Sequence, residues 1–119
     1  MKVFISQPMS GHTEEEILIR RSDMIKEFSK LEPKAYYLDS FIRGAKDVNP
    51  LFCLGHAISE LSKADIAIFA PDWQTSRGCH IEFECCLFYN IPMCEARYID
   101  DGSGICELRF FEMKGRPAE

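Results

Sequence analysis

Ala64-Asp65-Ile66-Ala67-Ile68-Phe69-Ala70 is the clearest predicted strand of the sequence, and Pro71-Asp72 closes it. A short apolar run between turn-forming residues is typical of a strand buried inside a parallel sheet. Lys2–Ser6 is a second run of this kind, and Gln7-Pro8 stops it. These two strands decide the fold class, because the segments between them carry helical spacing.

Two helices are predicted between these strands. The first begins at Thr13, which forms a capping box with Glu16, and Pro33 ends it. Its expected core stripe is apolar at helical spacing and comprises Ile17, Met24, Ile25, Phe28 and Leu31. After a loop at 39–48, the second helix opens with Asn49-Pro50, an N-cap followed by proline at the first helical position, and runs to about Lys63.

The remaining elements complete an alternating pattern. We predict a strand at 35–38, a third helix at roughly 79–89, a strand at 92–96 and an edge strand at 105–113, after a turn at 100–104. The order β-α-β-α-β-α-β indicates a parallel sheet of four to five strands with right-handed crossovers on both faces. We therefore expect one domain, residues 1–119, with an α/β fold of the flavodoxin-like (Rossmann-like) type, a three-layer sandwich.

Composition narrows the possible partners. The net charge of −5 argues against a protein that binds duplex nucleic acid, and no run of Lys and Arg favours a membrane surface. The first apolar run is too short for a signal peptide, and no stretch approaches the roughly 18–20 apolar residues of a transmembrane helix. We expect a cytoplasmic protein.

The cysteines and histidines suggest no metal site. The six cysteines include the adjacent pair Cys85-Cys86 but no CxxC repeat, so we expect reduced, mostly buried thiols. His12, His56 and His80 lack the spacing of metal ligands. The sequence therefore predicts neither a metal nor a cofactor.

The predicted fold indicates where a ligand would bind. Open α/β sheets bind ligands beyond the carboxyl ends of the strands, where the strand order reverses. In a flavodoxin-like order this point lies between the first and third strands, so the loops 7–12 and 71–78 are expected there. Ser6, Gln7, Ser10 and Gly11 then precede a helix N-terminus, which suits an anion or a ribose, although a plain βα turn explains them equally well.

The second loop carries more chemistry. Glu82 is expected in the first turn of the third helix, where free N–H groups favour its ionised form, as a nucleophile or a stabiliser of a developing cation. The simpler alternative is an acid that only complements the helix dipole. Asp72 is either a catalytic or ribose-binding acid or a turn residue. Trp73 either stacks on a base or covers the end of the sheet, and Arg77 either binds a phosphate or is solvated.

Cys79 supports a weaker alternative, a thiol protein. Its position near a helix start and beside His80 is compatible with a lowered pKa. However, side chains of adjacent helical residues point away from each other, which disfavours a Cys–His pair.

Three blocks of residues carry a resemblance to a known family: Lys2-Val3-Phe4-Ile5-Ser6-Gln7-Pro8-Met9-Ser10-Gly11 with Thr13-Glu14-Glu15-Glu16-Ile17; Leu61-Ser62-Lys63-Ala64-Asp65 with Ala70-Pro71-Asp72-Trp73 and Arg77-Gly78-Cys79-His80-Ile81-Glu82; and Tyr89-Asn90-Ile91-Pro92. With them the chain resembles the nucleoside 2-deoxyribosyltransferase-like superfamily, most closely its small members that open with this strand and loop.

The resemblance implies an enzyme that cleaves or transfers at the N-glycosidic bond of a (deoxy)nucleoside or its 5′-monophosphate. The family motif of a glycine, three residues and a glutamate matches Gly78 to Glu82, so Glu82 would be the nucleophile, and Asp72 is a candidate proton donor. The expected substrate contacts follow the two loops: Ser6, Gln7, Pro8, Met9, Ser10, Gly11, Trp73, Ser76, Arg77 and Gly78.

The chain also departs from the family pattern. Characterised transferases carry an aspartate where this chain has Ser76, and a second acid near the position of His56. These departures keep open the alternative of a non-catalytic module that binds or senses a nucleotide in the same cleft. Because such transferases often complete their site from a neighbouring subunit, the resemblance also implies a homo-oligomer, a dimer or larger.

Overall fold

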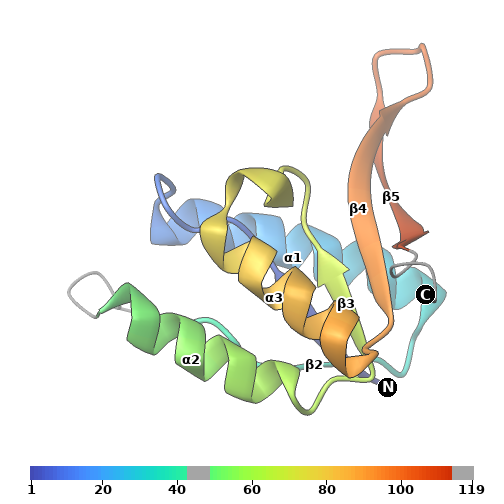
Figure 1. Ribbon diagram of the computed structural model, residues 1–119. Coiled ribbons are helices and arrows are strands. Elements are labelled where there is room, and N and C mark those ends of the chain that lie inside the picture. The colour runs from blue at the N-terminus through green and yellow to red at the C-terminus, as the bar shows by residue number, and fades with distance from the viewer. Residues whose placement is uncertain (43–48, 114–119) are drawn as a thin grey trace.

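The computed structural model describes residues 1–42 and 49–113. Helices and strands alternate through most of this chain (Figure 1). In chain order the elements are β1 (Lys2–Ser6), α1 (Glu14–Leu31), β2 (Tyr36–Tyr37), α2 (Pro50–Leu61), β3 (Ile66–Phe69), the 3-10 helix η2 (Trp73–Thr75), α3 (Arg77–Tyr89), β4 (Met93–Asp100) and β5 (Cys106–Met113). Part of the predicted 39–48 loop, residues 43–48, lies outside the described residues.

The five strands form one mixed sheet in the order β2-β1-β3-β4-β5. β1, β2, β3 and β4 run parallel, and β1 lies between β2 and β3, so the predicted reversal of strand order beside β1 and β3 is confirmed. The expectation of a wholly parallel sheet is wrong, because β5 runs antiparallel to β4. The turn between Asp100 and Cys106 is far shorter than the dozen or more residues that a parallel crossover needs.

Helices cover both faces of the sheet (Figure 1). On one face, Met24 and Phe28 of α1 pack against alternate residues of the central strands, such as Ile5 and Ile68. On the other face, α2 and α3 cover the intervening residues, such as Phe69. The period of two along each strand therefore divides the core into two clusters, one on each side.

Local capping signals set where the helices begin. Thr13 and Glu16 form the predicted capping box, and the Asn49 side chain accepts a hydrogen bond from the Leu51 N–H at 2.8 Å. α3 begins at Arg77, two residues earlier than predicted, because Ser76 is its N-cap and accepts from the Cys79 N–H at 3.3 Å.

Two further features differ from the sequence-based expectation, the burial of Leu31 and the end of β4. Leu31, placed in the core stripe of α1, is 64% exposed in the last turn of the helix. β4 continues to Asp100, whereas its pairing with β3 ends at Glu95. The remainder of β4 pairs only with β5, and this hairpin stands clear of the rest of the molecule (Figure 1).

Among the described residues, no helix is both long and apolar enough to cross a membrane. All six cysteines carry free thiols. Cys79, Cys86 and Cys94 are buried, Cys53 and Cys85 are half-buried, and Cys106 is exposed.

Candidate functional site

A buried hydrogen bond joins the end of β1 to α3. Ser6, the last residue of β1, donates its Oγ–H to Oε1 of Glu82 over 2.6 Å. The two residues are 1% and 6% exposed. This pair lies at the carboxyl end of β1, beside which the strand order reverses. Ligands of open α/β sheets usually bind at such a position.

The position of Glu82 within α3 differs from the prediction. Because the helix begins at Arg77, Glu82 lies in the second turn, and the first turn contains no acidic residue. Its helical face is the buried one, which it shares with Cys79 and Cys86. The carboxylate is therefore held by Ser6 against the sheet and not by the free N–H groups of the helix start.

Burial controls the protonation of Glu82. Loss of solvent raises its pKa from 4.5 to about 7, and the hydrogen bond from Ser6 opposes part of this shift. The expectation that its surroundings favour the ionised form is therefore wrong, because desolvation outweighs the hydrogen bond from Ser6. Near neutral pH the carboxyl group is poised between its two protonation states, a property common in acid–base catalysts.

Cys79 lies next to this pair and has a raised pKa. Burial is the main cause, hydrogen bonds with Ser6 and Ser76 oppose it, and the charge of Glu82 adds to it. The lowered pKa considered for Cys79 is therefore wrong. His80 is not among the causes of this shift, and its Nε2 lies 2.7 Å from the backbone oxygen of Gln74.

The loop after β1 places its polar groups at two depths. Gln7 is buried and donates its Nε2–H to the backbone oxygen of Ile17 over 3.0 Å, while its Oε1 has no partner among the described residues. Pro8 is also buried and Met9 is half-buried. Ser10 and Gly11 are exposed, and Gly11 takes the left-handed conformation at φ 81° that glycine favours.

The loop after β3 presents two charged side chains on its surface. Asp72 is exposed at φ 66°, and its side chain does not cap η2. Arg77 is exposed at the start of α3, and Gly78 is half-buried beside it. Neither Asp72 nor Arg77 belongs to the Ser6–Glu82 hydrogen bond.

Trp73 belongs to the core. It is 7% exposed, and its ring centroid lies 5.2 Å from that of Phe69 and 5.0 Å from that of Phe83. The side chain thus covers the end of the sheet, one of its two predicted roles. Its Nε1 has no hydrogen-bond partner among the described residues.

Sequence reasoning did not single out Ser40. This residue follows β2, is buried, and its Oγ has no partner among the described residues. The one signal in the sequence was that Ser40 comes just after a predicted strand. Residues of ordinary loops have the same position, so this signal does not identify a site. Its hydroxyl adds a third orphaned buried polar atom to those of Gln7 and Trp73, in the loops that follow β1, β2 and β3.

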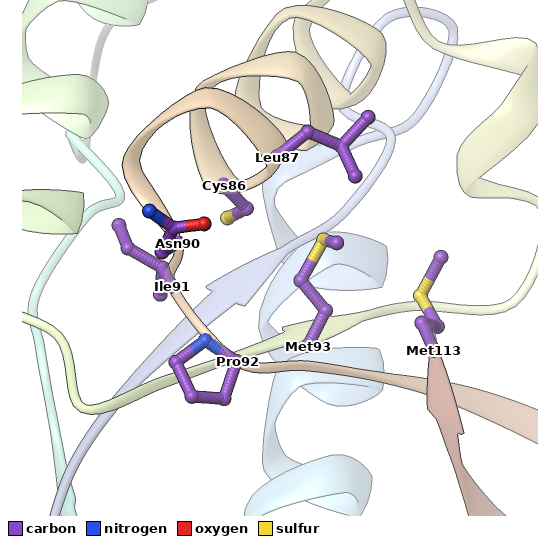
Figure 2. A pocket seen from close by; sticks show the side chains of 7 residues that line it. All are labelled: Cys86, Leu87, Asn90, Ile91, Pro92, Met93 and Met113. Carbon is purple, nitrogen blue, oxygen red and sulfur yellow. The ribbon is translucent and has the colours of Figure 1, made fainter. Parts of the chain in front are cut away.

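Two pockets lie at the other end of the sheet. One, of about 220 Å³, is formed where α3 turns into β4; its lining is Cys86, Leu87, Asn90, Ile91, Pro92, Met93 and Met113 (Figure 2). The other, of about 340 Å³, lies on the α1 side and is lined by Phe28 and Phe110 among others. Neither is lined by Glu82, so these two pockets are separate from the Ser6–Glu82 pair.

The described residues contain no group of three histidine, cysteine or acidic side chains arranged to hold a metal ion. Compared with known proteins, the chain matches no family model and no curated protein.

Proposed function

We propose that the chain binds a nucleoside or its 5′-monophosphate and acts on the N-glycosidic bond, with Glu82 as the nucleophile. One observation supports this most directly: a carboxyl group that is 6% exposed lies at the carboxyl end of β1, tied to Ser6 over 2.6 Å. A buried carboxyl group with a pKa near neutrality, at the usual ligand edge of an α/β sheet, is typical of a catalytic residue. We also propose that the fold is a flavodoxin-like three-layer sandwich.

The proposed reaction uses the ionised form of Glu82. Its carboxylate attacks the anomeric carbon, the bond from that carbon to the base breaks, and the base leaves with the electron pair. Asp72, exposed on the loop after β3, supplies the proton that the leaving base takes up. The glycosyl-enzyme ester is then opened by water, which gives hydrolysis, or by a second base, which gives transfer.

Ser6 is a positioning residue in this scheme. Its hydroxyl fixes one carboxylate oxygen and favours the charged form of Glu82. The sugar or its 5′-phosphate is proposed to contact 7–11, with Ser76, Arg77 and Gly78 on the other side. Because Glu82 is almost wholly buried, the chain around it has to move for a sugar to reach it.

A second candidate function uses the same end of the sheet for binding, without chemistry. The burial of Glu82 also suits a structural carboxyl group, and Ser76 serves as the N-cap of α3 where transferases carry an aspartate. The Nε2 of His56 lies 3.2 Å from the backbone oxygen of Asp39, at a position where transferases carry an acid. These features favour a module that binds a nucleotide and does not turn it over.

The partners are proposed with the function. We propose a small-molecule nucleoside or nucleotide ligand, a homo-oligomeric assembly and a cytoplasmic location.

Base release separates the two candidates. The protein is incubated with a panel of (deoxy)nucleosides and their 5′-monophosphates, and free base is measured by chromatography, with Glu82→Ala as the test and Glu15→Ala, an exposed acid of α1, as the control. Release that is lost in Glu82→Ala and kept in Glu15→Ala supports the nucleophile. Equal release in both contradicts it, whereas ligand-dependent thermal shifts without any product favour the binding module.

A further inference from the structure

Among the described residues, no strand pairs with the outer edge of β5. In the part of the chain that the structure describes, β5 is the last strand of the sheet and pairs with β4 alone. Its residues, Cys106–Met113, contain neither proline nor lysine, and their pairing with β4 continues without a bulge. Because an open edge offers free N–H and C=O groups to another strand, proteins commonly protect it with proline, a bulge or charged side chains. Of these devices β5 has only its charges, on Glu107, Arg109 and Glu112. The β4–β5 hairpin also stands at the margin of the molecule (Figure 1).

Two like charges face each other across the hairpin. Arg109 of β5 lies directly opposite Arg97 of β4, and like charges in opposite positions destabilise a sheet. Each arginine contacts a carboxylate on its own strand: Arg109 Nη2 lies 2.9 Å from Glu107, and Arg97 Nη2 lies 3.4 Å from Glu95. An acidic residue placed opposite Arg109 on an added strand offsets the like charge of Arg97 on the other side.

We propose that β5 pairs antiparallel with β5 of a second copy of this chain, about a two-fold axis at Leu108. In this register Glu107 of each copy lies opposite the partner's Arg109, so one axis creates two cross-strand pairs of opposite charge. The two Leu108 side chains meet on the sheet face that α1 covers, where Leu108 already packs against the core. The two sheets then join into one continuous sheet.

Neighbouring registers lack this complementarity. Side chains that lie opposite each other must point to the same face of the sheet. The two-fold axis therefore passes through a residue of β5 and not between two residues, so the alternative registers place it at a neighbouring residue. An axis at Arg109 places two arginines opposite each other, and an axis at Glu107 places two glutamates opposite each other. An axis at Phe110 places Arg109 opposite an aromatic side chain. Only the axis at Leu108 pairs both charges.

Charge-swapped variants test the register directly. The full chain is prepared as Glu107→Arg, as Arg109→Glu and unchanged, and the mass of each is measured by size exclusion with light scattering. Lys30→Glu, an exposed charge reversal on α1, is the control. We expect a two-chain mass for the unchanged protein and the control. In each single variant we expect the dissociation constant of the pair to rise about tenfold or more.

Each single variant also breaks the Glu107–Arg109 contact within its own strand. A mixture of the two variants distinguishes this loss from the loss of the contacts between the two copies. The Glu107→Arg copy carries two arginines and the Arg109→Glu copy carries two glutamates, so only a mixed pair has complementary charges. The proposal predicts that the mixture regains the two-chain mass. It is overturned by a single-chain mass of the unchanged protein, by a two-chain mass that Glu107→Arg leaves intact, or by a mixture that stays dissociated. None of these outcomes bears on base release, so the pairing and the proposed chemistry fail separately.

Discussion

At the scale of single residues, Glu82 couples folding to pH. Its pKa of about 7 in the folded chain exceeds the ordinary 4.5, so the folded state keeps a proton that the unfolded chain releases between these pH values. The free energy of unfolding therefore falls as pH rises through this window, by up to about 3 kcal/mol. In Glu82→Gln, which cannot ionise, urea unfolding from pH 4.5 to 7 should lose this slope. An unchanged slope would mean that Glu82 titrates normally in the folded chain.

Ser6 controls the same equilibrium from the other side. Ser6→Ala removes the hydrogen bond that lowers the pKa of Glu82, so the rise of base release with pH should move to higher pH. A buried carboxyl group without its partner should also lower the free energy of unfolding by about 1–3 kcal/mol. Ser22→Ala, an exposed serine of α1, should change neither the pH profile nor the stability. A loss of rate at every pH with an unmoved profile would contradict the positioning role.

Ser6 and Glu82 were both candidate site residues from the sequence, but the hydrogen bond between them was not predicted. Ser6 and Glu82 are 76 residues apart, and only the packing of α3 across β1 brings them together. The direction of the Glu82 pKa was mispredicted for the same reason: a helix dipole can be inferred from neighbouring residues, whereas desolvation depends on distant ones. Ser40 was missed because its burial is likewise a tertiary property.

At the scale of elements, the end of α3 depends on Asn90. This residue is the C-cap at φ 58°, a left-handed conformation that asparagine tolerates and glycine adopts without strain. Asn90→Ala should lower the free energy of unfolding by about 1 kcal/mol, whereas Asn90→Gly should leave it unchanged or raise it slightly. Urea unfolding of the two variants measures the difference. Equal stability of both would show that the turn into β4 tolerates a Cβ at this position.

Elements with local signals were predicted well, and the others were not. The capping box at Thr13 and the Asn49-Pro50 start depend on neighbouring residues, so α1 and α2 begin where the sequence indicated. The residue pattern of β5 fits an edge strand of either direction. It was expected to be parallel because the strands and helices before it alternate. Its direction follows from the short turn before it, a constraint that the element pattern alone does not express.

At the scale of the whole molecule, the two ends of the sheet have different characters. The carboxyl ends of β1 and β3 carry the Ser6–Glu82 pair and the loops that hold orphaned polar atoms. The amino end of β4 carries the two pockets, which are lined mainly by apolar side chains. The strand order that creates the first end was predictable, because alternating strands and helices admit few arrangements. The pockets were not, because they arise between elements that are distant in sequence.

The outer half of the hairpin is separable from the fold. Residues 99–107 are exposed except for half-buried Ile99, and none belongs to the buried core. Replacing 99–107 by a tight Asn-Gly turn should therefore lower the free energy of unfolding by about 1 kcal/mol or less. Phe28→Ala is the contrasting variant, because its buried ring contacts Phe110 with centroids 5.2 Å apart, and it should cost about 3–5 kcal/mol.

The same shortened chain also separates folding from association. Because it lacks Glu107, it cannot form the charge pairs proposed for β5, and its mass should fall to that of one chain while its circular dichroism keeps the helical signal of α1, α2 and α3. Unfolding curves and light scattering on the same sample measure both properties. A shortened chain that stays paired would place the interface elsewhere, and one that unfolds would mean that the hairpin supports the core across Phe110 and β4 more strongly than its exposure indicates.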